Sequence, residues 1–350
     1  MPKAQTKPAR GRLQARDERE GWLDLLFVPV ILVALIIWLS ATTHGFLDTD
    51  NLTNILLQGA LLGIVAFGMT FLILAGELDL SVGSGVALVS VVSALVMRDT
   101  GSVGLGVLAG LGCGVALGLV NGLVVTKLEV PSFIATLGTL VIAHGFALAL
   151  TNGAVVAGIP ESIGNLSSGT FLGVRWLIWL MVAVFVTLYL LQRKTTFGIK
   201  VVSVGGNKEA SRLSAINVDR VRLLCFVLVG LTVGIAGIAL TSRVESGQPN
   251  AGSLLALTAI AAVVVGGTSL TGGHGSLMKT LWGVLLLSVL DNGLDVKGID
   301  PDLKQVVIGT VFIAAASVDF IQRRVRESTT QTALATERAG VDDSARAPVG

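Results

Sequence analysis

Cysteine and histidine are scarce in this chain of 350 residues, which contains two cysteines and three histidines. Cys113 and Cys225 each lie inside an apolar run, so we expect them to pack in the interior and not to form a disulfide framework. The histidines, His44, His144 and His274, show no ligand spacing with one another or with carboxylates. We therefore expect no metal site and no cofactor.

Charged and aromatic residues are also few. Only 14% of the residues are charged and 5% are aromatic, whereas 52% are hydrophobic and the mean hydropathy is +0.80. This composition is far more apolar than that of a soluble domain and predicts an integral membrane protein. The 43 glycines favour tightly packed helices over a β-barrel with aromatic girdles. The predicted fold class is therefore an all-α membrane protein, and nucleic acid is not expected as a partner.

The sequence lacks the motifs of nucleotide hydrolysis and of nucleophilic catalysis. No G-x-x-x-x-G-K-[ST] sequence occurs, so the chain is not expected to hydrolyse ATP itself. No G-x-S-x-G sequence is present either. The glycine-rich string GGTSLTGGHG, residues 266–275, is therefore interpreted as a turn between two helices. We predict a transport subunit and not an enzyme.

Ten apolar runs are candidates for membrane helices. The first, residues 22–39, has no clean cleavage site after it, so we interpret it as an uncleaved helix. The other nine are predicted at residues 53–75, 81–97, 102–126, 132–152, 171–192, 221–241, 254–270, 276–290 and 303–321. Residues 21–322 would form the membrane domain, and the polar tails at 1–20 and 323–350 are expected to be disordered and cytoplasmic.

Basic residues cluster in three places: the first 20 residues, the loop 193–222 and residues 323–326. Cytoplasmic loops of membrane proteins carry an excess of lysine and arginine. Ten helices with the amino terminus inside bring all three clusters to the cytoplasmic side, whereas nine or eleven helices would leave the last cluster outside. We therefore predict that both termini are cytoplasmic.

The chain repeats itself with an offset of about 170 positions. Four groups of residues align in order: Gly83-Ser84 with Gly252-Ser253, Asn121-Gly122 with Asn292-Gly293, Pro131 with Pro301, and Gly138-Thr139 with Gly309-Thr310. Several matches at a nearly constant offset indicate an internal duplication, which pairs helices 2–5 of the predicted ten with helices 7–10. Because five spans separate equivalent helices, the two copies must have opposite orientations, an inverted-repeat architecture typical of transporters.

Four polar residues are candidates for contacts along a translocation path. Asp79 and Ser81 lie between two apolar runs, and Asn121 and Asn292 are equivalent in the two repeats. A carboxylate at the end of a span is costly unless it is hydrated or paired, and an amide can bond a polyhydroxylated solute. The alternative is structural: Asp79 would cap the third helix, and the two asparagines would cap the ends of their helices.

The one long charged segment between apolar spans is the loop 193–222. Within it, residues 207–216 predict a short helix, with Ala210, Leu213 and Ile216 three residues apart. This spacing offers an apolar ridge to a soluble partner.

Five segments of the chain, in order, are similar to those of a known family. They are GELDLSVG (76–83), PSFIATLGT (131–139), GGNKEASRLSAINV (205–218), AIAAVVVGGTSLTGG (259–273) and DNGL (291–294). Over residues 40–322 the chain resembles the ABC-transporter permeases for monosaccharides, of the ribose, xylose, arabinose and galactoside branch. The resemblance implies a ten-helix permease subunit paired with a second permease subunit, as a homodimer or heterodimer. It also implies a cytoplasmic ABC ATPase, which binds the ATP, and an extracytoplasmic sugar-binding protein.

In that family a Glu-Ala-Ala-like loop forms a coupling helix that docks in the ATPase. The resemblance assigns this role to Gly206, Glu209, Ala210, Arg212 and Leu213. Two positions depart from the pattern, because Ser211 replaces a second alanine and Ala215 replaces the glycine that usually closes the helix. Alanine lacks the freedom of glycine at positive φ, so the closing turn is less obvious here.

The expected function is ATP-driven import of a monosaccharide across a bacterial cell membrane by this multi-pass subunit. A neutral sugar fits because the helices contain few charges, whereas a charged solute or a coupling ion would need charged groups within the membrane. The sugar is not indicated, because Ala256 and Thr258 stand where related ribose permeases carry acidic residues. Three alternatives stay open: an ABC permease for branched-chain amino acids or another small solute, an ion-coupled secondary transporter, and an intramembrane enzyme.

Overall fold

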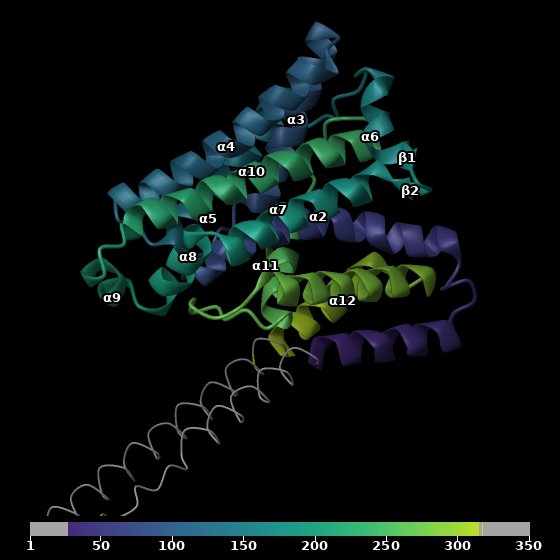
Figure 1. Cartoon of the computed structure of the whole chain (residues 1–350). Coiled ribbons are helices and arrows are strands. Elements are labelled where there is room, and N and C mark those ends of the chain that lie inside the picture. Colours follow the sequence, from purple (N-terminus) through teal and green to yellow (C-terminus); the bar gives the residue numbers. More distant parts are fainter. Residues whose placement is uncertain (1–26, 315–316, 318–350) are drawn as a thin grey trace, which may run out of the picture.

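The computed structural model describes residues 27–314 and residue 317, and most of them are helical (Figure 1). The predicted tails at 1–20 and 323–350 lie outside the described residues. The longer helices are Phe27–Thr42, α2 (Thr49–Leu74), α3 (Val82–Thr100), α4 (Val103–Lys127), α5 (Ser132–Thr151), α7 (Trp176–Lys194), α8 (Thr196–Gly206), α10 (Val218–Val244), α11 (Leu255–Val265), α12 (Leu277–Val296) and residues 301–314. The shorter elements are η1 (Glu161–Gly164), α6 (Asn165–Ser168), β1 (Thr170–Phe171), β2 (Val174–Arg175) and α9 (Lys208–Leu213).

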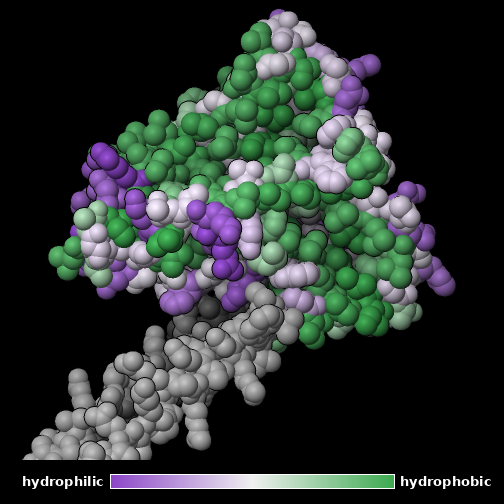
Figure 2. All heavy atoms as spheres, viewed as in Figure 1, coloured by the Kyte–Doolittle hydropathy of each residue, from purple (hydrophilic) through white to green (hydrophobic). Residues whose placement is uncertain are grey.

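Seven helices in the described part of the chain are long and apolar enough to cross a membrane: α2, α3, α4, α5, α7, α10 and α12. Shorter apolar helices accompany them at Phe27–Thr42, Thr196–Gly206 and Leu255–Val265. Figure 2 shows hydrophobic residues covering most of one face, with hydrophilic residues gathered toward its ends. The all-α membrane class is thus confirmed, whereas fewer helices than the predicted ten meet the requirements of length and composition.

Three helices form the interior of the bundle and three others form its outside. α2, α3 and α10 are largely buried, and the Phe67, Phe71 and Leu72 side chains of α2 are fully enclosed. α4, α5 and α7 instead leave large apolar side chains exposed, such as Leu108 on α4 and Val141 on α5. Such apolar outer faces suit contact with lipid.

Three predicted helix boundaries are wrong by five residues or more. The helix predicted at 276–290 is α12, which continues to Val296. The helix predicted at 254–270 is α11, whose 11 residues end at Val265 because the chain turns at Gly266 and at Gly267, which has a φ of +94°. At about 16 Å this helix is too short to cross a membrane. The helix predicted at 171–192 begins only at Trp176, because the preceding residues form the β1–β2 hairpin.

Close contact between helices depends on glycine. α4 lies against α10, and a Cβ atom added to Gly118 of α4 would lie 3.0 Å from the Cα of Gly230 of α10. The starts of α3 and α11 also meet, since a Cβ atom on Gly252 would lie 2.5 Å from the carbonyl oxygen of Gly83, and one on Gly83 would meet the carbonyl oxygen of Gly252. Gly83 and Gly252 are equivalent in the predicted repeat, so the two halves of the chain touch at matching positions.

Candidate functional site

The loop between α7 and α10 holds the two short helices α8 and α9 at one end of the bundle (Figure 1). Asn207 separates them, and its Oδ1 accepts a 2.9 Å hydrogen bond from the backbone N–H of Ala210. This bond is an N-cap, which satisfies one of the free donors at the start of α9. The short helix predicted at residues 207–216 is therefore present, but it ends at Leu213.

The end of α9 is closed by an alanine in a left-handed conformation. Ala215 has a φ of +60°, its N–H donates to the carbonyl of Arg212, and the N–H of Ile216 donates to the carbonyl of Ser211. These two bonds form a Schellman motif, in which the left-handed residue is usually glycine. The closing turn thus forms even though alanine replaces glycine, and the conformation of Ala215 carries some steric strain.

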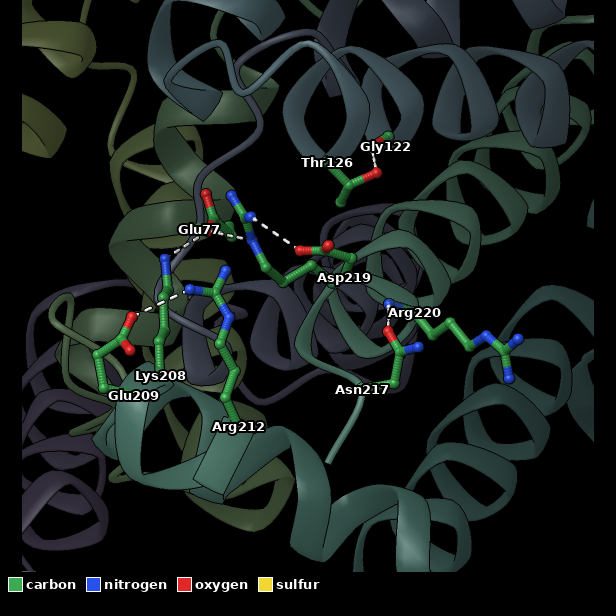
Figure 3. A network of polar contacts seen from close by, with 10 residues as sticks. Glu77, Gly122, Thr126, Lys208, Glu209, Arg212, Asn217, Asp219 and Arg220 are labelled. Carbon is green, nitrogen blue, oxygen red and sulfur yellow. Dashed lines mark hydrogen bonds and ion pairs between the residues drawn. The ribbon is translucent and has the colours of Figure 1, made fainter. Parts of the chain in front are cut away.

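Every residue to which the resemblance assigns coupling is exposed: Gly206, Glu209, Ala210, Arg212 and Leu213. Leu213 is 91% exposed, which is unusual for a large apolar side chain outside a lipid-facing helix. Glu209 and Arg212 form an ion pair of 3.0 Å on the surface of α9 (Figure 3). Ile216, the third residue of the predicted apolar ridge, is half-buried against the core. The free surface of α9 therefore combines the apolar side chains of Ala210 and Leu213 with a charged pair.

A buried ion cluster joins this loop to the bundle. Glu77, between α2 and α3, accepts hydrogen bonds on Oε1 from Lys208 Nζ at 2.8 Å and from Arg222 Nε at 2.7 Å. Asp219 lies on the other side of Arg222, at 3.8 Å. The sequence indicated that a carboxylate at this place needs a partner, but it did not identify Glu77 as a site residue. The signal that could have identified Glu77 is the position of an acidic residue directly after an apolar span.

Backbone contacts reinforce the same junction. The carbonyl of Leu74, the last residue of α2, accepts a 2.9 Å hydrogen bond from the N–H of Gly273 in the loop between α11 and α12. A Cβ atom on Gly205 of α8 would meet this carbonyl, and one on Gly273 would lie 2.7 Å from the Cα of Gly206. The string at 266–275 is therefore the predicted turn between two helices, and it also packs against α8 and the end of α2.

Three of the four predicted path residues form one buried hydrogen-bonded cluster. Asp79 Oδ1 accepts bonds from the N–H and the hydroxyl of Ser81, at 2.8 and 2.6 Å. Asn121 Nδ2 donates to Asp79 Oδ2 at 3.2 Å and to Ser81 Oγ at 2.9 Å. Thr139 of α5, which the sequence did not single out, donates to Asn121 Oδ1 at 2.6 Å. The segment between α2 and α3, α4 and α5 thus meet through polar side chains.

Burial has a direct effect on the carboxylate of this cluster, which lies in the connection between α2 and α3. Removal from water raises the pKa of the Asp79 carboxyl above its ordinary value of 3.8, whereas the hydrogen bonds from Ser81 and Asn121 act to lower it. Every donor around Asp79 is a neutral group. The cluster is therefore a mainly uncharged environment of hydroxyl and amide groups.

The capping alternatives are not supported for these residues. Asp79 bonds the N–H of Ser81, which precedes α3, and not an amide of the first turn of α3. Asn121 lies inside α4 and bonds side chains of other segments.

The two prolines that the repeat aligns each lie at the start of a helix. Pro131 directly precedes α5, and Pro301 begins the helical segment 301–314.

Asn292, the fourth predicted path residue, lies apart from this cluster. It is buried on α12, and its Nδ2 donates a 3.0 Å hydrogen bond to Asn51 Oδ1 of α2. Its own Oδ1 is buried and has no hydrogen-bond partner among the described residues. The two asparagines that are equivalent in the sequence repeat therefore have different surroundings, and only Asn292 keeps an open acceptor.

The described residues contain no group of three or more histidine, cysteine or carboxylate side chains that could hold a metal ion. Cys225 is buried in the core and Cys113 packs partly buried against it, and both are free thiols. Within the described part of the chain, both cysteines thus occupy the packing positions that their apolar surroundings predicted.

Comparison with known proteins places these features in a family. The family described as branched-chain amino acid transport system, permease component, matches residues 51–316. The chain is 42% identical to the ribose import permease protein of Bacillus subtilis over 87% of this chain and 96% of that protein. It is 39% identical to the ribose import permease protein of Escherichia coli, over 86% and 95%. It is 35% identical to the L-arabinose ABC transporter permease protein of Azospirillum brasilense, over 93% and 95%.

No solved structure matches the chain. The family match nevertheless covers more than half of the sequence, and it includes the polar cluster, the ion cluster around Glu77 and helix α9. Members of such a family are membrane-embedded transport subunits and not enzymes. This multi-pass chain therefore belongs to the family of transport-system permease components.

Proposed function

We propose that this chain is the permease subunit of an ATP-binding-cassette importer that carries a monosaccharide across a bacterial cell membrane. The observation that carries the proposal is its similarity, along nearly the whole chain, to permeases named for ribose and L-arabinose. The polar cluster around Asn121 agrees with it, since hydroxyl and amide groups suit a neutral, polyhydroxylated solute. The subunit needs no cofactor of its own, because the partner ATPase binds the ATP.

Three protein partners belong to this proposal. They are a cytoplasmic ABC ATPase, an extracytoplasmic sugar-binding protein, and a second permease subunit that is either a copy of this chain or a related one. The solute path would run along the interface between the two permease subunits. Binding of ATP would move the ATPases and rock the permease between inward- and outward-facing states.

Reconstitution of the three components tests the function directly. The chain, its ATPase and its binding protein are placed in lipid vesicles, and uptake of labelled ribose, arabinose, xylose and galactose is measured with and without ATP. We expect uptake of one of these sugars that requires ATP and the binding protein. Uptake of none of them by a complex that hydrolyses ATP would refute the assignment to monosaccharides.

The family description itself supports a second candidate, because it names branched-chain amino acids. The same vesicles distinguish the two candidates, since leucine uptake that is not inhibited by any sugar would favour the amino-acid permease. An ion-coupled transporter is a third possibility that needs a free carboxylate inside the membrane. The two candidates are Asp79 and Asp291. Asp291 of α12 is paired with Lys304 at 2.9 Å, whereas Asp79 is buried among neutral donors. Uptake that persists when an ion gradient is collapsed would exclude this possibility.

We propose further that ten spans form two inverted repeats, with both termini inside the cell. In the proposed repeat, α2 is equivalent to α10, α3 to α11 and α4 to α12. The helix contacts follow this equivalence, because α4 packs on α10 as α12 packs on α2, and α3 packs on α4 as α11 packs on α12. The contact between Gly83 and Gly252 joins equivalent positions. In this arrangement α11 is a short helix, and the α11–α12 loop after it reaches the end of α2, where the N–H of Gly273 binds the carbonyl of Leu74.

Labelling of single introduced cysteines tests this topology. Lys208→Cys should react with a membrane-impermeant thiol reagent only from the inside of the cell, and Asp99→Cys at the end of α3 only from the outside. The unmodified chain is the control, because Cys113 and Cys225 lie within α4 and α10. Reaction of both introduced cysteines from the same side would contradict the arrangement.

Helix α9 is proposed to be the coupling helix that docks in the ATPase. The exposure of Glu209, Ala210, Arg212 and Leu213 on a capped helix, with Gly206 before its cap, supports this role. Glu209→Arg should leave the chain in the membrane but abolish copurification of the ATPase, since it breaks the pair with Arg212 and reverses a surface charge. The matched control is Asp99→Arg, an exposed charge reversal at the end of α3. Normal transport by the Glu209→Arg complex would show that α9 does not dock.

Asp79, Ser81, Asn121 and Asn292 are proposed to line or border the solute path. The first three satisfy one another, so a solute would have to compete with existing hydrogen bonds there. Asn292 Oδ1 is the exception, because it has no hydrogen bond to break, and a sugar hydroxyl could reach this buried oxygen once the helices around it move. Asn292→Leu should therefore lower sugar uptake while ATPase copurification is retained. Unchanged uptake would remove Asn292 from the path.

A further inference from the structure

Glu77 is the centre of the contact between α9 and the helix bundle. The residue is only 5% exposed, and one carboxylate oxygen accepts hydrogen bonds from both Lys208 of α9 and Arg222 of α10. Figure 3 shows Glu77 and Lys208 reaching toward each other across the junction. A buried carboxylate that loses its cationic partners is left uncompensated, which costs far more than breaking an exposed ion pair. Arg222 would still bind Glu77 if Lys208 moved away, but the 2.8 Å bond from Lys208 is the one that connects α9 to this carboxylate. We therefore expect a displacement of α9 to act on Glu77 through Lys208.

The segment that carries Glu77 leads directly into the polar cluster. Asp79 follows two residues later, and its carboxylate binds Ser81 and Asn121. Backbone N–H groups of the same segment donate to Ser132 Oγ at 3.3 Å and to Thr136 Oγ1 at 3.1 Å, both on α5. This short connection is therefore held at one end by α9 and α10 and at the other by α4 and α5.

The glycine contacts make the same junction stiff. Gly205 and Gly206 at the end of α8 lie against the end of α2 and against Gly273, with no room for a Cβ atom at Gly205 or Gly273. The hydrogen bond from Gly273 to Leu74 fixes the end of α2 to the loop between α11 and α12. A displacement of α8, which directly precedes α9, would thus be passed to the end of α2 and to the α11–α12 loop through backbone atoms.

We propose that Glu77 is a positioning residue that transmits the movement of α9 to the polar cluster of Asp79 and Asn121. This inference rests on the proposed role of α9 in coupling and extends it to the interior of the permease. When the ATPase displaces α9, Lys208 moves Glu77, and the segment 77–81 moves Asp79 relative to α4 and α5. ATP hydrolysis thereby becomes linked to a rearrangement next to the start of α3.

The experiment is a measurement of sugar transported per ATP hydrolysed in vesicles that contain the complete complex. Glu77→Gln keeps the side-chain size and removes the charge, and it should lower this ratio about tenfold. The ATPase should still copurify, because the exposed surface of α9 is unchanged. Lys208→Met provides a second test from the other side of the pair, and its partly exposed position makes folding robust.

Asp99→Asn is the matched control. It removes an exposed carboxylate at the end of α3, away from the ion cluster, so the ratio should equal that of the unmodified complex. A purely structural role for Glu77 would lower the yield of the complex and leave the transport ratio unchanged. Ratios for both Glu77→Gln and Lys208→Met equal to that of Asp99→Asn would overturn the inference. Absence of ATP-driven sugar uptake by the unmodified complex would instead refute the proposed function.

Discussion

Two glycines of α4 provide a direct test of how this bundle is held together. Gly118 faces α10, and a Cβ atom there would lie 3.0 Å from the Cα and 3.1 Å from the N of Gly230, and closer still to the carbonyl oxygen of Phe226. Gly112, on the same helix, would have no atom within 4 Å of an added Cβ. The substitutions Gly118→Ala and Gly112→Ala are therefore chemically identical but differ in the space available.

The expected magnitudes follow from this difference. Replacing a helical glycine by alanine stabilises a helix by about 1 kcal/mol, and both variants share this gain. At Gly118 the new methyl group meets only backbone atoms, which cannot rotate away, so α4 and α10 must separate. Overpacking of this kind costs about 1–3 kcal/mol. Gly112→Ala should therefore be more stable than the unmodified chain, and Gly118→Ala should be less stable than Gly112→Ala by about 1–3 kcal/mol.

Thermal unfolding of the purified chain in detergent measures the effect, with a separation of about 1–4 °C expected between the two midpoints. Gly138→Ala on α5, another glycine with nothing within 4 Å of an added Cβ, should behave like Gly112→Ala. Equal midpoints for Gly118→Ala and Gly112→Ala would mean that the close contact between α4 and α10 does not determine stability, and the reasoning would fail.

Three further predictions concern the site. Ala215→Gly should relieve the strain of the left-handed conformation and stabilise the end of α9 by less than about 1 kcal/mol. Amide hydrogen exchange there should become slower, and faster exchange would contradict the Schellman turn. Because burial raises the pKa of Asp79, its stabilising contribution is present below its ordinary value of 3.8 and is lost as the pH rises through the raised value. As the pH rises, the unfolding midpoint of the unmodified chain should therefore fall relative to that of Asp79→Asn. A midpoint of the unmodified chain that rose relative to that of the variant would contradict the raised pKa. Asn121→Leu should destabilise the chain by about 3 kcal/mol, because it leaves the buried Asp79 carboxylate with fewer donors. Asn292→Leu should cost only about 1 kcal/mol, because it removes one amide–amide bond. Equal unfolding midpoints for the two variants would argue against the cluster.

The sequence predicts the helices well because apolar runs and their polar interruptions are local features. The boundaries of α4 and α5 are each predicted to within one residue of those observed. The end of α11 is missed because Val263, Val264 and Val265 continue into glycines that hydropathy alone does not mark as a turn. The β1–β2 hairpin is missed for a similar reason, since its Phe171 and Leu172 resemble the start of an apolar helix.

The partners within the site are harder to predict than its members. Asp79, Ser81 and Asn121 stand out as polar residues among apolar ones, and the structure brings them together. Thr139 belongs to one of the repeat matches but is not indicated as a site residue, because a threonine within a helix commonly bonds the backbone of its own helix. The partners of Glu77 come from a distant loop, and no local pattern relates its carboxylate to Lys208. Pairing across such separations depends on how the helices pack, which a single sequence does not contain.

The two equivalent asparagines show why an internal repeat predicts less than it suggests. Asn121 is enclosed by a carboxylate and two hydroxyl groups, whereas Asn292 meets one asparagine and keeps an open oxygen. The proposed repeat does not bring these partners with it, because at an offset of 169 the positions equivalent to Asp79 and Ser81 are Gln248 and Asn250. Asn292 therefore has no equivalent carboxylate to bond, even if the two halves have the same fold. A repeat of this kind predicts where a buried amide lies, but the partners of that amide depend on residues that the two halves do not share.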